Sequence, residues 1–115
     1  MRNKLVACPV ETTLLLISDR WKILILRELL DGTKRFGELR KAIGTISPKV
    51  LTSHLRSMEE DGLVEREIFA EVPPRVEYTL SETGESLKPI LDAMKDWGTD
   101  YQTKIKLQMK ETNKD

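Results

Sequence analysis

The chain has 115 residues, which is enough for one domain with one modest hydrophobic core. At 39% hydrophobic and 33% charged residues it has the composition of an ordinary soluble globular protein. No apolar run reaches the roughly 18 residues that a membrane span needs, and no secretory signal is visible at the N-terminus. The single cysteine, Cys8, excludes an internal disulfide framework, so we expect a reducing, cytoplasmic setting.

The net charge of zero hides an uneven distribution of charges along the chain. Residues 33–57 hold six basic residues against one acidic residue, whereas residues 58–72 hold six acidic residues against one basic residue. A neutral protein with a local basic segment can still bind phosphate on one face. Nucleic acid is therefore not excluded as a partner, and we expect its nonspecific affinity to be modest and dependent on salt.

Two helices are expected in the first third of the chain. Pro9 suits the first position of a helix, with Cys8 as the residue before it, because the missing N–H of proline is not needed there. A second helix is predicted over residues 20–30, after a break at Ser18-Asp19 and before a turn at Asp31-Gly32.

The next stretch, residues 33–61, organises the chain, because it has the pattern of a helix-turn-helix. A short strand is expected at residues 33–35 and a first helix over residues 36–42. A turn follows at residues 43–46, and a second helix is predicted over residues 48–60.

The second of these helices has clear end signals and two different faces. The Ser47 hydroxyl can cap its start, and Gly62 is a stop signal. The apolar stripe expected to face the core is Leu51, Leu55 and Met58. The remaining surface carries side chains suited to base edges and phosphates in a major groove, namely Lys49, Thr52, Ser53 and Arg56. This pattern is typical of a recognition helix.

Two strands are predicted directly after the recognition helix. Residues 63–69 alternate partly, and residues 75–80 alternate between apolar and polar side chains. Val72-Pro73-Pro74 between them forms a stiff loop tip, since proline fixes φ and removes a donor. Two strands in this place form a β-wing, so the expected fold is α+β, mostly helical: a winged helix-turn-helix.

A final helix is predicted from Ser81 to about Met109, with Pro89 expected to kink it or to split off a first turn. An apolar seam runs along it, consisting of Leu87, Ile90, Leu91, Met94, Trp97, Tyr101 and Ile105. So small a monomer cannot cover this seam, which argues for a partner helix, most simply that of a second copy. We therefore expect a single domain over residues 1–115, with dimerisation by residues 1–18 and 85–109.

Four stretches in this order carry a family resemblance: CPVETTLLLISDRWKILILRELLDGTKRFGELRKAI, ISPKVLTSHLRSMEEDGLVERE, EVPPRVEYTLSETGESL and LDAMKDWG. They cover nearly the whole chain from Cys8 to Gly98, and their order and spacing are specific. The chain resembles the HxlR family of bacterial transcription regulators, within the broader MarR-like winged-helix group. Family members more often carry a glutamine or arginine where Pro48 or Ser53 stands, so the resemblance does not predict the operator sequence.

The resemblance implies a homodimer whose terminal helices form the interface and whose recognition helices enter major grooves of a near-palindromic operator in double-stranded DNA. The candidate DNA-binding residues are Lys34, Arg35, Ser47, Lys49, Thr52, Ser53, Arg56 and Arg75. Lys34 and Arg35 are expected to hold phosphates, and Arg75, in the wing, to approach the backbone or the minor groove. The alternatives are a solvated helix face and, for Arg75, a strand-end charge paired with Glu71 or Glu77.

Cys8 is a candidate redox sensor, because the resemblance implies that several members sense oxidants or electrophiles through a cysteine near the N-terminus. The start of a helix favours the thiolate form, and Arg2 and Lys4 lie nearby in an expected N-terminal arm. Any protein disulfide must join two chains. A structural or incidental cysteine, as a small buried hydrophobe, is the alternative.

The sequence therefore predicts a sequence-specific, homodimeric, DNA-binding transcription regulator. The alternatives are a winged-helix module that binds an acidic protein without specific DNA binding, and a regulator that responds to a small ligand rather than to thiol oxidation. An enzyme is not expected, because a Ser/His/Asp constellation, a phosphate-cradling loop and paired carboxylates are missing. One histidine, His54, and one cysteine cannot build a metal site, and no cofactor is expected.

Overall fold

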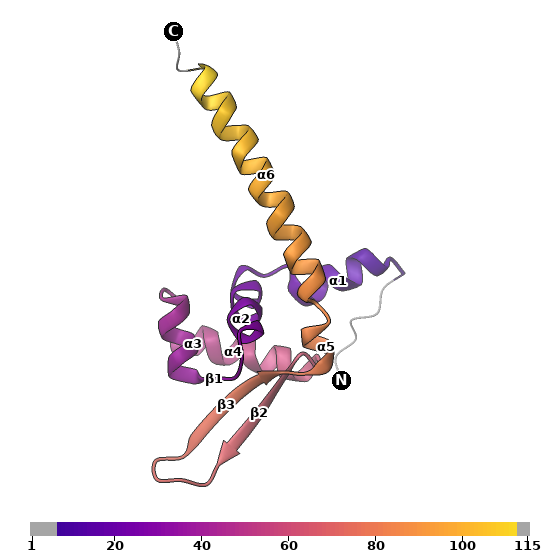
Figure 1. The fold of residues 1–115 in the computed structure, drawn as a ribbon. Coiled ribbons are helices and arrows are strands. Elements are labelled where there is room, and N and C mark those ends of the chain that lie inside the picture. The colour runs from indigo at the N-terminus through magenta and orange to yellow at the C-terminus, as the bar shows by residue number, and fades with distance from the viewer. Residues whose placement is uncertain (1–6, 113–115) are drawn as a thin grey trace. The chain divides into compact units, whose positions relative to one another are not determined.

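The structure, a computed structural model, describes residues 7–112, and Figure 1 shows its helices and its small sheet. The elements in chain order are α1 (Pro9–Ile17), α2 (Arg20–Leu30), β1 (Lys34–Arg35), α3 (Phe36–Ile43), α4 (Pro48–Glu60), β2 (Val64–Phe69), β3 (Arg75–Leu80), α5 (Glu82–Glu85) and α6 (Lys88–Thr112). The chain forms two compact units that divide between Glu85 and Ser86. The first unit is a winged helix-turn-helix, as the sequence predicts.

The helix ends follow from capping residues. The Asp19 carboxylate accepts a hydrogen bond from the Trp21 N–H (2.8 Å) at the start of α2. The Ser47 hydroxyl accepts one from the Val50 N–H (3.2 Å) at the start of α4, which confirms the predicted cap. Gly62 follows α4 with a φ of 78°, a conformation that glycine adopts without strain, and this explains why α4 stops there.

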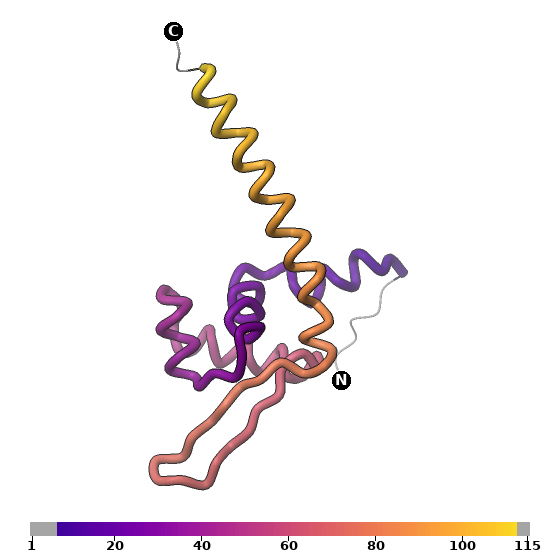
Figure 2. The backbone as a smooth tube through the Cα atoms, viewed as in Figure 1, coloured from indigo at the N-terminus to yellow at the C-terminus, as the bar shows by residue number. Residues whose placement is uncertain are grey.

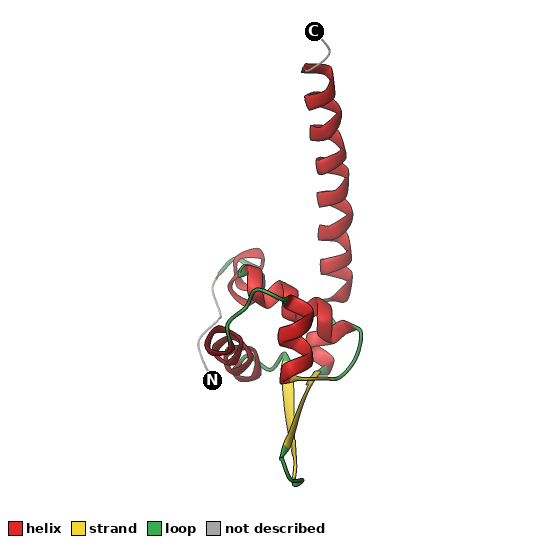
Figure 3. Ribbon diagram, turned by 90° about the vertical axis from the view of Figure 1, so that its left-hand side faces the viewer, coloured by secondary structure: helices red, strands yellow, loops and turns green. Residues whose placement is uncertain are grey.

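The sheet is antiparallel with the strand order β1-β3-β2. Lys34 pairs with Tyr78 at one edge of β3, and Arg66 pairs with the same residue from the other edge. Figures 1 and 2 show the β2–β3 hairpin, the predicted wing, extending away from α2, α3 and α4, and Figure 3 shows its two strands in yellow from the side. The hydroxyls of Thr33 and Thr79 lie 2.8 Å apart beside β1 and help to hold this short strand to the wing.

The core of the first unit explains how α4 is oriented. Its fully or almost fully buried side chains come from every large element: Ile17, Ile25, Leu26, Leu29, Leu39, Ile46, Leu51, Leu55, Met58, Leu63, Val64 and Leu80. The predicted stripe of α4 belongs to this set, so that prediction is confirmed. Because one face of α4 is fixed in the core, the opposite face must point away from it.

The C-terminal helix differs in detail from the prediction of one helix from Ser81 to about Met109. It is split, and the break at residues 86–87 lies ahead of Pro89, which takes the second position of α6. Proline is tolerated there because the first N–H groups of a helix have no partner within the helix. The helix also continues to Thr112, three residues beyond the predicted end near Met109.

One expectation falls on residues that the structure does not describe. Most of the expected N-terminal arm, including Arg2 and Lys4, lies outside residues 7–112. Within that range, none of the helices combines the length and the apolar character that crossing a membrane requires.

Candidate nucleic-acid interface

The outward face of α4 gathers the side chains that the sequence singles out. An open surface hollow runs along this face and is lined by Pro48, Lys49, Thr52, Ser53, Arg56, Ser57 and Glu60. Lys49, Ser53 and Arg56 are exposed, and Thr52 is half-buried. All four base-reading candidates therefore lie on one face of one helix, opposite the buried stripe.

This face has the chemistry and the size that groove recognition needs. An α-helix fits into the major groove of B-DNA, where arginine and lysine donate to guanine and hydroxyls bond to several base edges. The face offers two cationic donors and three hydroxyls without a large apolar group among them. Glu60 is the one acidic residue of the hollow and lies at the C-terminal end of α4, so the cationic part, from Lys49 to Arg56, precedes it along the helix.

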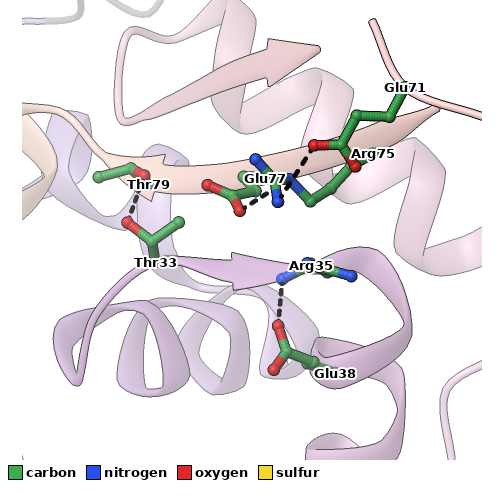
Figure 4. Close-up of polar contacts among 7 residues, drawn as sticks. All are labelled: Thr33, Arg35, Glu38, Glu71, Arg75, Glu77 and Thr79. Atoms are coloured by element: carbon green, nitrogen blue, oxygen red, sulfur yellow. Dashed lines mark hydrogen bonds and ion pairs between the residues drawn. The ribbon is translucent and has the colours of Figure 1, made fainter. Parts of the chain in front are cut away.

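Lys34 and Arg35 lie on β1, directly before α3, and not in the α4 hollow. The Arg35 N–H donates a hydrogen bond to the Glu38 carboxylate (2.8 Å), so Glu38 fixes the backbone where β1 becomes α3 (Figure 4). A second open hollow brings Arg35 together with the wing tip. It is lined by Arg35, Phe36, Gly37, Glu71, Val72, Pro73, Pro74, Arg75 and Val76. Arg35 and Arg75, which are far apart in the sequence, thus share a surface.

The wing arginine already has partners within the wing. One terminal nitrogen of Arg75 lies 3.4 Å from a Glu71 oxygen, and its Nε lies 3.3 Å from a Glu77 oxygen (Figure 4). Its guanidinium carbon also lies 4.1 Å from the centre of the Phe69 ring, a cation–π distance. Glu71 and Glu77, each of which the sequence offered as a partner for Arg75, therefore both pair with it.

Two residues where α4 meets the wing, Arg66 and Tyr78, were not among the candidates predicted from the sequence. Arg66 of β2 forms an ion pair with Glu59 of α4 (3.5 Å), and it pairs across the sheet with Tyr78. Burial raises the pKa of the Tyr78 phenol, while Arg66 and Arg56 act in the opposite direction. The phenol therefore stays protonated at neutral pH and can donate a hydrogen bond. No local signal marks these residues, because their proximity arises from the strand register.

His54 connects the recognition helix to the start of α2. Its Nε2 lies 3.5 Å from the Asp19 carboxylate oxygen that also caps α2, and its side chain is 19% exposed. His54 therefore lies at the edge of the core. The contact explains why His54 is not part of the outward face of α4, although its neighbour Ser53 is.

Cys8 is exposed at the start of α1. Its carbonyl oxygen accepts a hydrogen bond from the Thr12 N–H (3.0 Å), which is an ordinary first helical bond. Within one chain this exposure does not fit a small buried hydrophobe, and it does not separate a redox sensor from an incidental cysteine. A thiol in this place is accessible to a dissolved oxidant or to another thiol.

Two helices expose apolar side chains in the places expected for an interface. On α6, Trp97 is 69% and Tyr101 51% exposed, and their rings stack with centres 5.3 Å apart. Ile90 and Met94 of the predicted seam are exposed as well, Ile105 is half-buried, and Leu87 and Leu91 are buried. On α1, the exposed apolar residues are Val10, Leu14 and Leu15.

Comparisons with known proteins agree with this arrangement. The family model described as HxlR-like helix-turn-helix matches residues 16–106. The HTH-type transcriptional regulator YdeP of Bacillus subtilis (strain 168) is 49% identical over 98 residues, which are 85% of this chain and 77% of that protein. The redox regulator HypR in its reduced form is 42% identical with a TM-score of 0.81, over 86% of this chain and 98% of that one. The reduced form of the regulator YodB from B. subtilis is 39% identical with a TM-score of 0.72, and the match covers 80% of this chain and 91% of that one.

Proposed function

The chain belongs to the HxlR-like helix-turn-helix family, and on that premise we propose that it is a transcription regulator that binds a specific DNA sequence through the outward face of α4. The observation that carries this proposal is the contrast between the two faces of α4. One face is fixed in the core, and the other gathers Lys49, Thr52, Ser53 and Arg56 along one hollow. A rigidly held helix with such a surface can keep a register against base edges.

The proposed contacts fall into two classes. The side chains along the hollow, together with Ser47 at the start of α4, contact base edges and the nearest phosphates. Lys34 and Arg35 hold the backbone beside β1, which fixes the position of the protein without reading the sequence. Arg75 extends this set to the wing.

Competition between DNA duplexes tests this function against the alternative of a protein-interaction module. We expect the protein to prefer its own upstream DNA over a shuffled duplex of equal length, with affinity falling steeply as salt rises, because phosphate contacts release counterions. Fluorescence anisotropy over a range of salt concentrations measures both effects. Equal and weak binding to both duplexes would favour an acidic protein partner instead.

The proposed assembly is a homodimer that binds a near-palindromic operator. Support comes from the exposed apolar side chains of α6 and α1, since an exposed apolar patch such as that around Trp97 and Tyr101 marks a site of protein–protein contact. A two-fold dimer presents two copies of α4, and the operator then repeats its half-site with the same symmetry. These residues belong to the stretches 1–18 and 85–109 that we propose as the dimer interface.

The proposed signal is oxidation of Cys8. Support comes from the exposure of the thiol and from two similar structures, of which HypR is described as a redox regulator and YodB was solved in a reduced form. Oxidation can change DNA affinity only if it stabilises the DNA-competent and incompetent states differently. Because each chain holds one cysteine, a disulfide between protein chains must join two of them.

The variant Cys8→Ser separates a thiol sensor from a regulator that binds a small ligand. We expect an oxidant such as diamide to change the affinity of the wild type for its upstream DNA and to leave the affinity of Cys8→Ser unchanged. A non-reducing gel should show a species of twice the chain mass in the wild type alone, if the product is a disulfide. An equal response of both proteins to the oxidant, or no response of either, would remove Cys8 as the sensor.

A further inference from the structure

The most constrained charged group outside the α4 hollow is the guanidinium of Arg75 at the wing tip. Glu71 approaches it from the loop and Glu77 from the same strand, at 3.4 and 3.3 Å (Figure 4). The guanidinium carbon also lies over the Phe69 ring, 4.1 Å from the ring centre. The Arg75 side chain is only 27% exposed as a result. A wing arginine that contacts DNA must present this group to a phosphate, so the three neighbours compete with that contact.

These neighbours leave one hydrogen-bond donor of Arg75 without an acceptor. Its Nε is buried and finds no hydrogen-bond acceptor of good geometry among the described residues, although a Glu77 oxygen lies nearby. A buried donor without an acceptor is unfavourable, and a phosphate can accept two parallel hydrogen bonds from a guanidinium.

We propose that Glu71 and Glu77 are affinity-determining residues of the DNA interface, which act by holding Arg75 in a self-paired state that DNA phosphate must displace. The proposal rests on the function proposed above and assigns these carboxylates a role in it. Ion pairs at the protein surface contribute little to stability, so a phosphate can replace the carboxylates as the partner of Arg75 at a small cost in free energy. Without the two carboxylates, Arg75 would be ready to bind the backbone before the protein meets DNA.

The DNA affinity of glutamine variants tests this exchange. We expect Glu71→Gln and Glu77→Gln each to raise the affinity for the upstream duplex roughly two- to five-fold, the size of a surface charge interaction. The slope of log affinity against log salt should stay close to that of the wild type, because Arg75 neutralises the same phosphate in each complex and only its release from a carboxylate becomes easier. The matched control is Glu65→Gln, which removes the same charge from the neighbouring strand, opposite Thr79 and away from Arg75.

The same substitutions in an Arg75→Gln background complete the test. There, Glu71→Gln and Glu77→Gln should no longer raise the affinity beyond the effect of Glu65→Gln, since the arginine that they release is absent. The proposal is overturned if Glu65→Gln has the same effect, if the effects persist without Arg75, or if the glutamine variants bind more weakly. A wild type that prefers no duplex would instead contradict the proposed function itself. Should Arg75→Gln fail to fold, as judged by circular dichroism, the comparison with Glu65→Gln still decides.

Discussion

Replacing Arg56 by alanine should weaken binding to a specific duplex by roughly 5- to 150-fold, which corresponds to about 1–3 kcal/mol. Arg56 lines the α4 hollow, is exposed, and has the one guanidinium there, whose planar fork can donate two parallel hydrogen bonds to a guanine. Its loss should leave the stability of the protein nearly unchanged, because surface substitutions usually shift the free energy of unfolding by less than about 0.5 kcal/mol. Fluorescence anisotropy with the upstream duplex measures the affinity.

The matched control for this substitution is Arg27→Ala. Arg27 is an exposed arginine in the last turn of α2, outside the α4 hollow, so its removal changes the net charge by the same amount. We expect a small loss for Arg27→Ala, equal for specific and shuffled duplexes. Equal losses for both variants would mean that Arg56 acts through general charge and does not read the sequence.

Replacing Leu55 by alanine should lower the free energy of unfolding by about 2–5 kcal/mol, a large part of the stability of so small a domain. Leu55 is 1% exposed and lies in the middle of the buried stripe of α4, where deletion of its side chain leaves a cavity that the core cannot easily fill. Urea denaturation followed by circular dichroism measures the change. DNA binding should fall as well, because α4 loses its fixed orientation.

The variant Ser53→Ala provides the opposite case on the same helix. Ser53 is exposed, so its substitution should leave the denaturation midpoint almost unchanged and affect only the DNA affinity. If Leu55→Ala shifted the midpoint no more than Ser53→Ala does, the packing of α4 described above would be wrong.

The helix-turn-helix and the wing could be predicted from the sequence because their signals are local. Ser47 and Gly62 mark the two ends of α4, and Leu51, Leu55 and Met58 mark its buried face by their spacing. The prolines of the wing tip separate two strands whose partners are neighbours in the chain. The resemblance to one regulator family rested on the same stretches, and the family match confirms it.

Contacts between distant residues could be predicted far less well. Arg66 contacts Glu59 and Tyr78 because of the strand register. His54 contacts Asp19 because α4 packs beside the start of α2. Neither arrangement leaves a pattern in the sequence. The helix pattern around Pro89 fits a kink as well as a split, and only the folded chain decides for a split at residues 86–87. For Arg75, the sequence named both carboxylates as alternative partners, but the simultaneous pairing with both depends on the shape of the loop.

The most direct test of the central claim, that α4 reads a DNA sequence, is selection of bound duplexes from a randomised library by the wild type and by Arg56→Ala in parallel. We predict that the wild type enriches one motif with two symmetry-related halves, as a two-fold dimer requires. The variant should lose its preference at one base pair of each half and keep the rest. A wild type that enriches no motif would contradict the claim, as would a variant that selects the same motif with the same preference at every position. A motif with a single asymmetric site would contradict the dimer.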